Sequence, residues 1–155
     1  MLLYRIAHKQ YSRTLFAPGF SGRWNSEGKK VIYTAESIPL AFLESMLRRQ
    51  GAGFNRDFNT MVIEVPDTLP VKAIDIKQLP DGWRDSYDYR ICQQIGDKWY
   101  DSGETVLLKV PSAVLPDAAN YVIHAAHPDY SSIKLVDVTS LIPDHRIEKL
   151  LKKPF

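Results

Sequence analysis

The sequence predicts an α+β fold in which strands outnumber helices. The candidate strands follow one another in pairs without a regular helix between them, which is atypical of a doubly wound parallel sheet. The 155-residue chain is 45% hydrophobic and 25% charged, a composition typical of a globular protein with a buried core. No internal repeat, low-complexity tract or linker divides it. We therefore expect one domain that spans residues 1–155.

Short runs rich in β-branched and aromatic residues, bounded by turn-forming residues, predict the strands. They cover residues 2–6, 30–34, 60–65, 71–76, 105–110, 121–123 and 133–138. Pro18, Gly19 and Gly22 indicate a loop between the first two strands, from about residue 8 to residue 22. Pro66 and Asp67 indicate a turn between the third and fourth strands.

The segment after residue 36 has the signals of a helix start. Ser37 is a candidate N-cap, and Pro39 falls in the first turn, where its missing N–H does no harm. An apolar stripe along this helix consists of Leu40, Leu43 and Leu47. At about 100° per residue, Glu44 lies about 40° from Leu40. We therefore expect Glu44 within or at the edge of the buried face.

Breaker residues set the limits of the predicted helices. The first is expected to reach about residue 50, before Gly51 and Gly53. A second covers residues 86–102, with a stripe formed by Cys92, Ile95 and Trp99. A short terminal helix begins at Pro143 and carries Ile147, Leu150 and Leu151.

The charge pattern argues against a nucleic-acid-binding or membrane protein. The net charge is +2, and the lysines and arginines are scattered rather than gathered in a stripe. No apolar run approaches the ~20 residues of a membrane span, and the N-terminus lacks the features of a signal peptide. Cys92 is the only cysteine, so no internal disulfide can form and the cytoplasm is the expected location.

Several common catalytic motifs are absent. The segment 22–30 resembles a phosphate loop, but five residues separate Gly22 from Gly28 and Lys30 stands where a hydroxyl is needed. The histidines form no H-E-x-x-H pattern, and His124 with His127 lacks acidic or cysteine neighbours, so we expect no metal. Cys92 on an apolar helix face is typical of an inert core thiol.

Arg23, Tyr33 and Glu44 come from a predicted loop, strand and helix, each beside or among apolar residues. Charged groups in such surroundings are costly to desolvate unless they are paired or used. One interpretation is a pocket for an anionic, partly planar ligand. The other is a structural salt bridge beside a core tyrosine. The same two interpretations apply to Arg5, inside the first predicted strand.

Three more positions have both a structural and a functional interpretation. Trp24, next to Arg23, is by itself more typical of packing than of a stacking platform. Ser112 follows Pro111 at the end of a predicted strand, where it is either a turn hydroxyl or a ligand contact. Asn120 is open to the same two interpretations.

Ordered motifs along almost the whole chain resemble the RES family, named for an arginine, a glutamate and a serine. They are LYRI at 3–6, GRWN at 22–25, VIYTAES at 31–37, LAFLE at 40–44, GDKW at 96–99, LLKVPSAVLPDAANY at 107–121 and HPDYSSIKL at 127–135. One departure is YVIHAA at 121–126, where many relatives have Asn-Pro before the HPD segment. That difference alters a loop but leaves the proposed functional residues in place.

The resemblance implies a fold like that of ADP-ribosyltransferases, with mixed or antiparallel sheets flanked by helices. It implies NAD as the substrate, without a metal. By position, the catalytic residues are Arg23, Tyr33, Glu44 and Ser112. The candidate ligand-binding set is Arg5, Arg23, Trp24, Asn25, Tyr33, Ser37, Ser112 and Asn120.

Physical chemistry then suggests a role for each group on NAD. Arg23, helped by Arg5, can pair with the pyrophosphate in a fork geometry, and Tyr33 offers a flat face to the nicotinamide ring. Breaking the nicotinamide–ribose bond builds positive charge on the ribose. Glu44 can stabilise that charge, hold a ribose hydroxyl or orient the attacking group. Ser112 can bind a phosphate or the nicotinamide amide.

RES relatives are toxins of bacterial toxin–antitoxin pairs, so the expected function is NAD degradation by phosphorolysis or hydrolysis. An alternative in the same pocket is ADP-ribosylation of a cellular protein, and another is a binding module without catalysis. The resemblance further implies an Xre-type helix-turn-helix antitoxin that blocks the active site, inorganic phosphate as one acceptor, and self-association into a homodimer.

Overall fold

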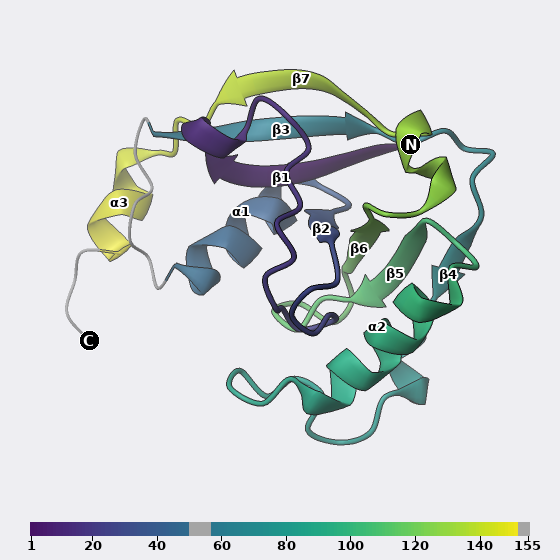
Figure 1. The fold of residues 1–155 in the computed structure, drawn as a ribbon. Helices are drawn as coiled ribbons and strands as arrows, with labels where there is room; N and C mark the ends of the chain where they lie inside the picture. The colour runs from purple at the N-terminus through teal and green to yellow at the C-terminus, as the bar shows by residue number, and fades with distance from the viewer. Residues whose placement is uncertain (50–56, 152–155) are drawn as a thin grey trace.

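A seven-stranded mixed sheet flanked by helices forms the protein in the computed structural model, which describes residues 1–49 and 57–151 (Figure 1). The spatial order of the strands is β4-β5-β6-β2-β1-β3-β7. Their bounds are β1 Leu2–His8, β2 Val31–Ala35, β3 Phe58–Glu64, β4 Val71–Ala73, β5 Leu107–Pro111, β6 Ala119–His124 and β7 Lys134–Ser140. β4 and β5 are parallel, and the other neighbouring strands are antiparallel. The predicted α+β class is confirmed.

Two well-paired halves of the sheet meet at a short junction. In one half β1 pairs with β3 along its whole length, and β3 pairs with β7. In the other half β2 pairs along its whole length with β6, which also pairs with β5. Between the halves, β1 and β2 are in register only at Tyr4 opposite Ala35. The backbone groups of β2 beyond this pair therefore need partners other than β1.

Side-chain alternation along the strands divides the core between the two faces of the sheet. One face buries an aliphatic cluster that includes Leu3, Ile32, Ile63, Leu107 and Ile123. The opposite face buries a cluster beneath each of two helices, α1 (Ile38–Arg48) and α2 (Arg90–Ser102). The α1 cluster contains Ile6, Ala35, Leu40, Ala41 and Phe58, and the α2 cluster contains Trp24, Trp83, Trp99, Leu108 and Val122.

The helix α1 begins as the sequence predicts. The Ser37 hydroxyl oxygen accepts the backbone N–H of Leu40 at 3.3 Å, and a proline lies in the first turn. This bond satisfies one of the N–H groups that a helix start leaves unpaired. The described helix ends at Arg48, and the predicted stop at Gly51 and Gly53 lies outside the described residues.

The buried face of α1 is turned relative to the predicted stripe. Its buried residues are Leu40, Ala41 and Ser45, whereas Leu47 is 55% exposed. Two small residues let the helix lie close to the sheet, which the hydrophobic pattern alone does not show. Glu44 is half-buried, as expected for the edge of this face.

The helix α2 starts four residues later than predicted because an aspartate turn precedes it. Asp85 Oδ1 accepts the N–H groups of Tyr87 and Asp88, at 2.7 and 2.8 Å. Asp88 Oδ1 then accepts the N–H of Arg90 at 3.0 Å, at the first helical residue. These local bonds compete with helical ones. Farther along, Cys92 and Trp99 are buried as expected.

The predicted strand at 71–76 is shorter than expected, and short 3₁₀ helices occur in the chain that were not predicted. A capping box at Asp75 ends the fourth strand early and starts a 3₁₀ helix over Ile76–Gln78. Two more cover Lys9–Tyr11 and Pro128–Ser132. The terminal helix α3 covers His145–Leu151 and has no buried residue. None of the described helices is both long and apolar enough to cross a membrane.

A glycine on α2 lets the helix touch the backbone of the segment that carries Arg23. A Cβ added to Gly96 would lie 1.7 Å from the carbonyl oxygen of Trp24 and 2.7 Å from its carbonyl carbon. Neither atom can move away without shifting the loop. The contact fixes the distance between α2 and residues 22–25.

Replacing Gly96 with alanine is expected to destabilise the protein by at least about 2 kcal/mol, because the overlap involves backbone rather than a flexible side chain. This loss should exceed the roughly 1 kcal/mol that alanine gains over glycine in a helix. Urea unfolding measures it. The control Gln94→Ala changes an exposed position of the same helix and should stay within about 0.5 kcal/mol. Equal stability of both variants would contradict the close contact.

Candidate active site

Glu44 on α1 meets two polar side chains from the other half of the sheet. Ser112 Oγ donates to Glu44 Oε1 at 2.7 Å, and Asn120 Nδ2 donates to the same oxygen at 2.6 Å. Ser112 directly follows β5 and Asn120 lies on β6, where it pairs with Val110. The strand register therefore brings the two donors side by side beneath the helix.

Ser112 is a turn hydroxyl and a partner of Glu44 at the same time. It is fully buried, and its Oγ accepts the backbone N–H groups of Val114 and Leu115, each at 3.1 Å. Since the oxygen accepts from the turn, its own proton is left for the carboxylate. The turn interpretation of Ser112 is confirmed, and its contact with a ligand stays a prediction.

The carboxylate is held on one side only. Oε1 of Glu44 accepts two hydrogen bonds, whereas Oε2 accepts none from a described residue. No described cation lies within ion-pair distance of Glu44, so the alternative of a salt bridge with Arg23 is wrong. The carboxylate is fixed in orientation and keeps one oxygen for another group.

Tyr33 on β2 uses its hydroxyl to fasten the preceding loop. Its Oη donates to Asn25 Oδ1 at 2.5 Å and accepts the backbone N–H of Trp24 at 2.9 Å. Burial raises the pKa of Tyr33 above its ordinary value, because the charged phenolate would be desolvated. A Cβ on Gly22 would lie 2.6 Å from this hydroxyl oxygen, which explains a glycine there.

Asn25 and Trp24 are structural parts of the same loop. The Asn25 amide donates to the carbonyls of Phe20, Ser26 and Lys29, and the Trp24 side chain is buried in the α2 cluster. Among the described contacts, all the polar ones of Asn25 are internal to this network. The packing interpretation of Trp24 is the one that the structure supports. Ser37 likewise serves as the cap of α1.

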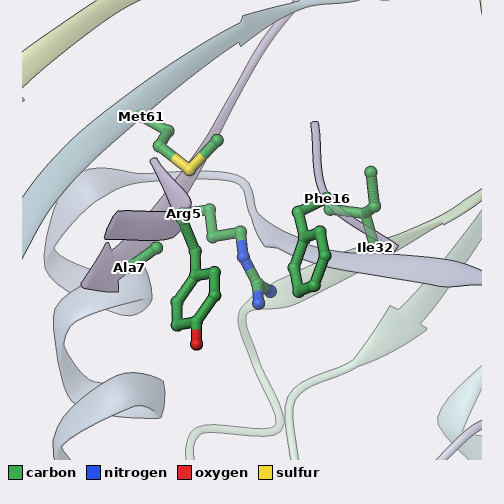
Figure 2. Close-up of a pocket in the computed structure, with 6 residues that line it drawn as sticks. Arg5, Ala7, Phe16, Ile32 and Met61 are labelled. Carbon is green, nitrogen blue, oxygen red and sulfur yellow. The ribbon is translucent and has the colours of Figure 1, made fainter. Parts of the chain in front are cut away.

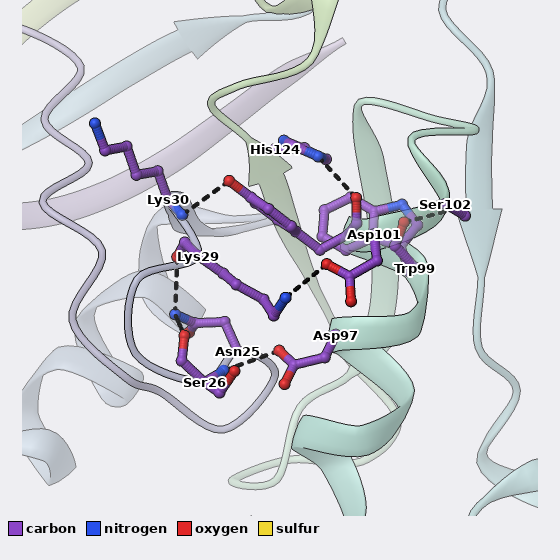
Figure 3. Close-up of polar contacts among 10 residues, drawn as sticks. Asn25, Ser26, Lys29, Lys30, Asp97, Trp99, Asp101, Ser102 and His124 are labelled. Atoms are coloured by element: carbon purple, nitrogen blue, oxygen red, sulfur yellow. Dashed lines mark hydrogen bonds and ion pairs between the residues drawn. The ribbon is translucent and has the colours of Figure 1, made fainter.

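The helix α2 binds the loop from the other side. Gln93 Nε2 donates to the carbonyls of Gly22 and Asn25 at 2.9 and 3.2 Å. Figure 3 shows two further bonds, from the Ser26 N–H to Asp97 at 2.9 Å and from Lys29 to Asp101 at 2.6 Å. The loop therefore has a fixed shape although it contains little regular structure.

Arg23 points toward the segment before α2 and does not touch Glu44. Its Nη1 donates to the carbonyls of Trp83 and Asp85 at 2.7 and 2.9 Å. Its guanidinium carbon lies 4.6 Å from the centroid of the Tyr89 ring. Among the described contacts, none joins Arg23 to Glu44, Ser112 or Asn120.

Arg5 bridges the two halves of the sheet. From β1 its Nη1 donates to the carbonyl of Tyr33 on β2 at 2.9 Å. Around it is a small hollow lined by Ala7, Tyr11, Phe16, Ile32 and Met61, and the guanidinium lies beside the Phe16 ring (Figure 2). Burial, followed by the charges of Arg48 and Arg49, lowers the pKa of Arg5 to about 10.

Arg48 and Arg49, at the end of α1, complete a group of three neighbouring cations. Arg48 lies over the Tyr33 ring at 5.9 Å and Arg49 over the Phe58 ring at 4.2 Å. No described carboxylate lies within ion-pair distance of Arg5, Arg48 or Arg49. Positive charge at a helix C-terminus is favourable, but that effect does not explain the buried Arg5.

His124, the histidine of the YVIHAA segment, has structural partners. His124 stacks on Tyr100 with centroids 3.8 Å apart, and its Nε2 lies 3.0 Å from the Tyr100 carbonyl oxygen (Figure 3). Its Nδ1 accepts the N–H of Ala126 at 3.2 Å. Burial lowers the pKa of His124. Within the described ranges, no three His, Cys, Asp or Glu side chains are grouped to hold a metal.

The RES domain model matches residues 2–145 of the chain. The protein belongs to the RES family. A "Prs ADP-ribosylating toxin" from Sphingobium sp. (strain YBL2) is 35% identical over 128 residues, 81% of this chain and 80% of that protein. A "Toxin Res" from Pseudomonas putida is 33% identical over 151 residues, 95% of this chain and 99% of that one.

A solved structure shares the RES fold seen here. It is a chain of the M. tuberculosis MbcT–MbcA toxin–antitoxin complex, with a TM-score of 0.75 and 20% identity. The match covers 98% of this chain and 89% of that chain. At this identity the likeness establishes the fold, a mixed sheet flanked by helices.

The structure shows which of the three residues that name the RES family are in contact, and the sequence does not. Glu44 and Ser112 are in contact, whereas Arg23 of the same signature bonds to the carbonyl of Trp83 and not to Glu44. Sequence reasoning missed Arg48, because an arginine in the last turn of a helix is typical of a solvated surface. The available signal was its spacing of four residues from Glu44, which puts both on one side of α1.

Replacing Tyr33 with phenylalanine is expected to destabilise the protein by about 1–3 kcal/mol, because the Trp24 N–H and Asn25 Oδ1 lose their buried partner. The raised pKa means that the neutral phenol stabilises the fold below about pH 10 and that this contribution falls at higher pH. The difference from the wild type should therefore narrow between about pH 8 and about pH 11.

Unfolding curves at the two pH values measure this difference. Tyr87→Phe is the control, because Tyr87 is 97% exposed and its removal should leave the stability difference near zero at both values. A constant gap for Tyr33→Phe across this pH range would contradict the buried phenol.

Proposed function

We propose that the protein is the toxin of a toxin–antitoxin pair and that it cleaves the nicotinamide–ribose bond of NAD. The observation that carries the proposal is the Glu44 carboxylate, fixed through Oε1 by Ser112 and Asn120 with Oε2 left over. The names of two relatives support the same activity, because both are called toxins and one of them is called ADP-ribosylating.

The reaction needs a negative group beside the sugar carbon. The bonding electrons leave with nicotinamide, which departs as a neutral molecule, and the ribose becomes a short-lived oxocarbenium ion. A fixed carboxylate stabilises that charge without having to reorient. Water or phosphate then adds through oxygen and loses a proton when water is used. The products are ADP-ribose or its 1-phosphate.

The arginines on α1 and β1 suit the phosphate that is attached to the same ribose. One helical turn separates Glu44 from Arg48, so the two Cβ atoms are roughly 6 Å apart on one face. The ribose of a nucleotide carries its phosphate a few bonds from the carbon that reacts. We assign the pyrophosphate to Arg48 and the buried Arg5, which have no described carboxylate to neutralise them.

The contacts of Arg23 narrow its predicted role, whereas the role of Tyr33 stays with its ring. The two N–H groups of Arg23 Nη1 are used by carbonyls, so only the rest of its guanidinium is left for an anionic group. The Tyr33 hydroxyl is used by the loop. Its ring, beneath Arg48, is the part that we assign to the substrate.

A second candidate is ADP-ribosyl transfer to a protein. The printed name of the Sphingobium relative favours it, and it requires the same bond to break. The partner in either case is an antitoxin, as the toxin–antitoxin complex of the structural neighbour supports. We assign the antitoxin to the Xre helix-turn-helix type, place its action in the cytoplasm and expect it to cover Glu44. A toxin homodimer and phosphate as acceptor belong to the same proposal.

Replacing Glu44 with glutamine should lower NAD consumption by at least about 100-fold, because the side chain keeps its acceptor oxygen but loses its charge. Stability should change little. The control Glu27→Gln alters an exposed carboxylate and should behave as the wild type. Chromatography of nicotinamide release measures the rate.

The products of the wild type identify the acceptor. Free ADP-ribose indicates hydrolysis, ADP-ribose 1-phosphate in phosphate buffer indicates phosphorolysis, and a labelled protein band indicates transfer. No NAD loss under any condition would show a binding module instead. Near-normal turnover by Glu44→Gln would remove the carboxylate from the mechanism.

Replacing Arg48 with alanine should raise the KM for NAD about tenfold with a smaller effect on kcat, because one charge-assisted contact to phosphate is lost. Initial rates over a range of NAD concentrations measure both constants. Arg146→Ala is the control, since this exposed helical arginine already pairs with Asp144 at 2.9 Å. An unchanged KM in Arg48→Ala would place the pyrophosphate elsewhere.

A further inference from the structure

Asn120 has a fixed orientation at the centre of the site. A carboxylate oxygen only accepts hydrogen bonds, so the amide nitrogen of Asn120 must face Glu44 Oε1, 2.6 Å away. The strand β6 holds the backbone of Asn120 in a ladder with Ala35 on one side and Val110 on the other. The amide therefore has no freedom to exchange its nitrogen and oxygen without placing two acceptors face to face.

This orientation leaves the other half of the amide without a partner. Oδ1 of Asn120 is the buried side-chain oxygen or nitrogen, within the described part of the chain, that makes no hydrogen bond. Buried acceptors are almost always paired, because desolvation without a hydrogen bond is unfavourable. The unpaired oxygen belongs to the same amide group that holds Glu44. Asn120 as a whole residue is half-buried, although its Oδ1 atom is buried.

We infer that Asn120 has two tasks: Nδ2 orients Glu44, and Oδ1 accepts a hydrogen bond from a donor on the substrate. This inference rests on the proposed cleavage of NAD. Two donors of NAD lie next to the bond that breaks, the carboxamide N–H of nicotinamide and the hydroxyls of the attached ribose. Either supplies the missing partner after a small shift of the side chain that uncovers Oδ1.

The chemical consequence is a specificity for donors. An unpaired carbonyl attracts N–H and O–H groups and repels a carboxylate. A site built to hydrogen-bond a substrate group rejects analogues that lack this group more strongly than an apolar pocket does, since its own polar atom is left unpaired. The arginines select the phosphate part of the molecule, and Asn120 selects the end that reacts.

A purely structural role makes a different prediction. If Asn120 only orients Glu44, its loss resembles the loss of Ser112, which donates to the same carboxylate oxygen. Both variants would then slow every substrate by the same factor. Ser112→Ala is therefore the matched comparison for Asn120→Ala, because it removes one bond to Oε1 and leaves Oδ1 of Asn120 untouched.

The test measures kcat/KM for three substrates with the wild-type protein, Asn120→Ala and Ser112→Ala. The substrates are NAD, nicotinic acid adenine dinucleotide, which has a carboxylate in place of the carboxamide, and NAD that lacks the 2-hydroxyl of the nicotinamide ribose. The intrinsic reactivity of each analogue is the same for all three proteins. Changes in the ratio of NAD to analogue therefore report the contact.

For one analogue, we expect the ratio of kcat/KM for NAD to kcat/KM for the analogue to be at least about tenfold higher in the wild type than in Asn120→Ala. Ser112→Ala should keep the wild-type ratio. The analogue that shows the effect identifies the donor as the carboxamide or the hydroxyl. Equal loss on all substrates in both variants would overturn the inference and leave the proposed function standing. Equal ratios in the wild type and Asn120→Ala would also overturn the inference.

The inference does not depend on one variant alone. If Asn120→Ala fails to fold, Asn120→Ser is used, because a short hydroxyl side chain cannot reach both Glu44 and the substrate. The absence of NAD cleavage by the wild-type protein would overturn the proposed function and this inference together, which distinguishes that result from the loss of selectivity alone.

Discussion

The hydrogen bond from the Arg5 guanidinium to the Tyr33 carbonyl joins two half-sheets that otherwise meet at a single residue pair. At this junction a side-chain hydrogen bond joins the strands, whereas elsewhere in the sheet backbone hydrogen bonds join them. Because the strands separate at this point, the buried Arg5 reaches the junction from one half. The helix α1, which carries Glu44 and Arg48, places Arg48 over the Tyr33 ring. The carboxylate then finds its two donors on the other half, next to β5 and on β6.

The region around this junction is rigid because each irregular segment is bound to a regular one. The loop at 20–29 is bound by the Tyr33 hydroxyl on one side and by Gln93, Asp97 and the backbone contact at Gly96 on the other. The turn after β5 is closed by the Ser112 hydroxyl. Functional groups on loops need such support, because a small displacement weakens every contact to a substrate.

The sequence predicted the α+β class, the position of most elements and the cap at Ser37, because these depend on local periodicity and turn chemistry. It also placed Glu44 at the edge of a buried face. It did not show that Leu47 faces solvent, since the choice of the packed face depends on how closely α1 approaches the sheet. The late start of α2 depends on side-chain bonds at Asp85 and Asp88 that compete with the helix.

The sequence named candidate site residues but not the contacts between them. Glu44, Ser112 and Asn120 are together, but Arg23 contacts Trp83 and Asp85 instead of Glu44. Contacts between residues far apart in the chain are decided by strand register and helix placement, which no local pattern contains. Trp24 and Asn25, in the same motif as Arg23, form a structural unit that a ligand-binding assignment does not explain.

The partners of Glu44 come from 68 and 76 residues later in the chain. During synthesis, a polypeptide that ends before β6 contains Glu44, the arginines of α1 and the loop at 20–29. It lacks Asn120, one of the two donors to Glu44, and the strand with which β2 pairs along its whole length. Such a chain has no oriented carboxylate. Chains that end before β6 therefore cannot present Glu44 with both of its hydrogen-bond donors.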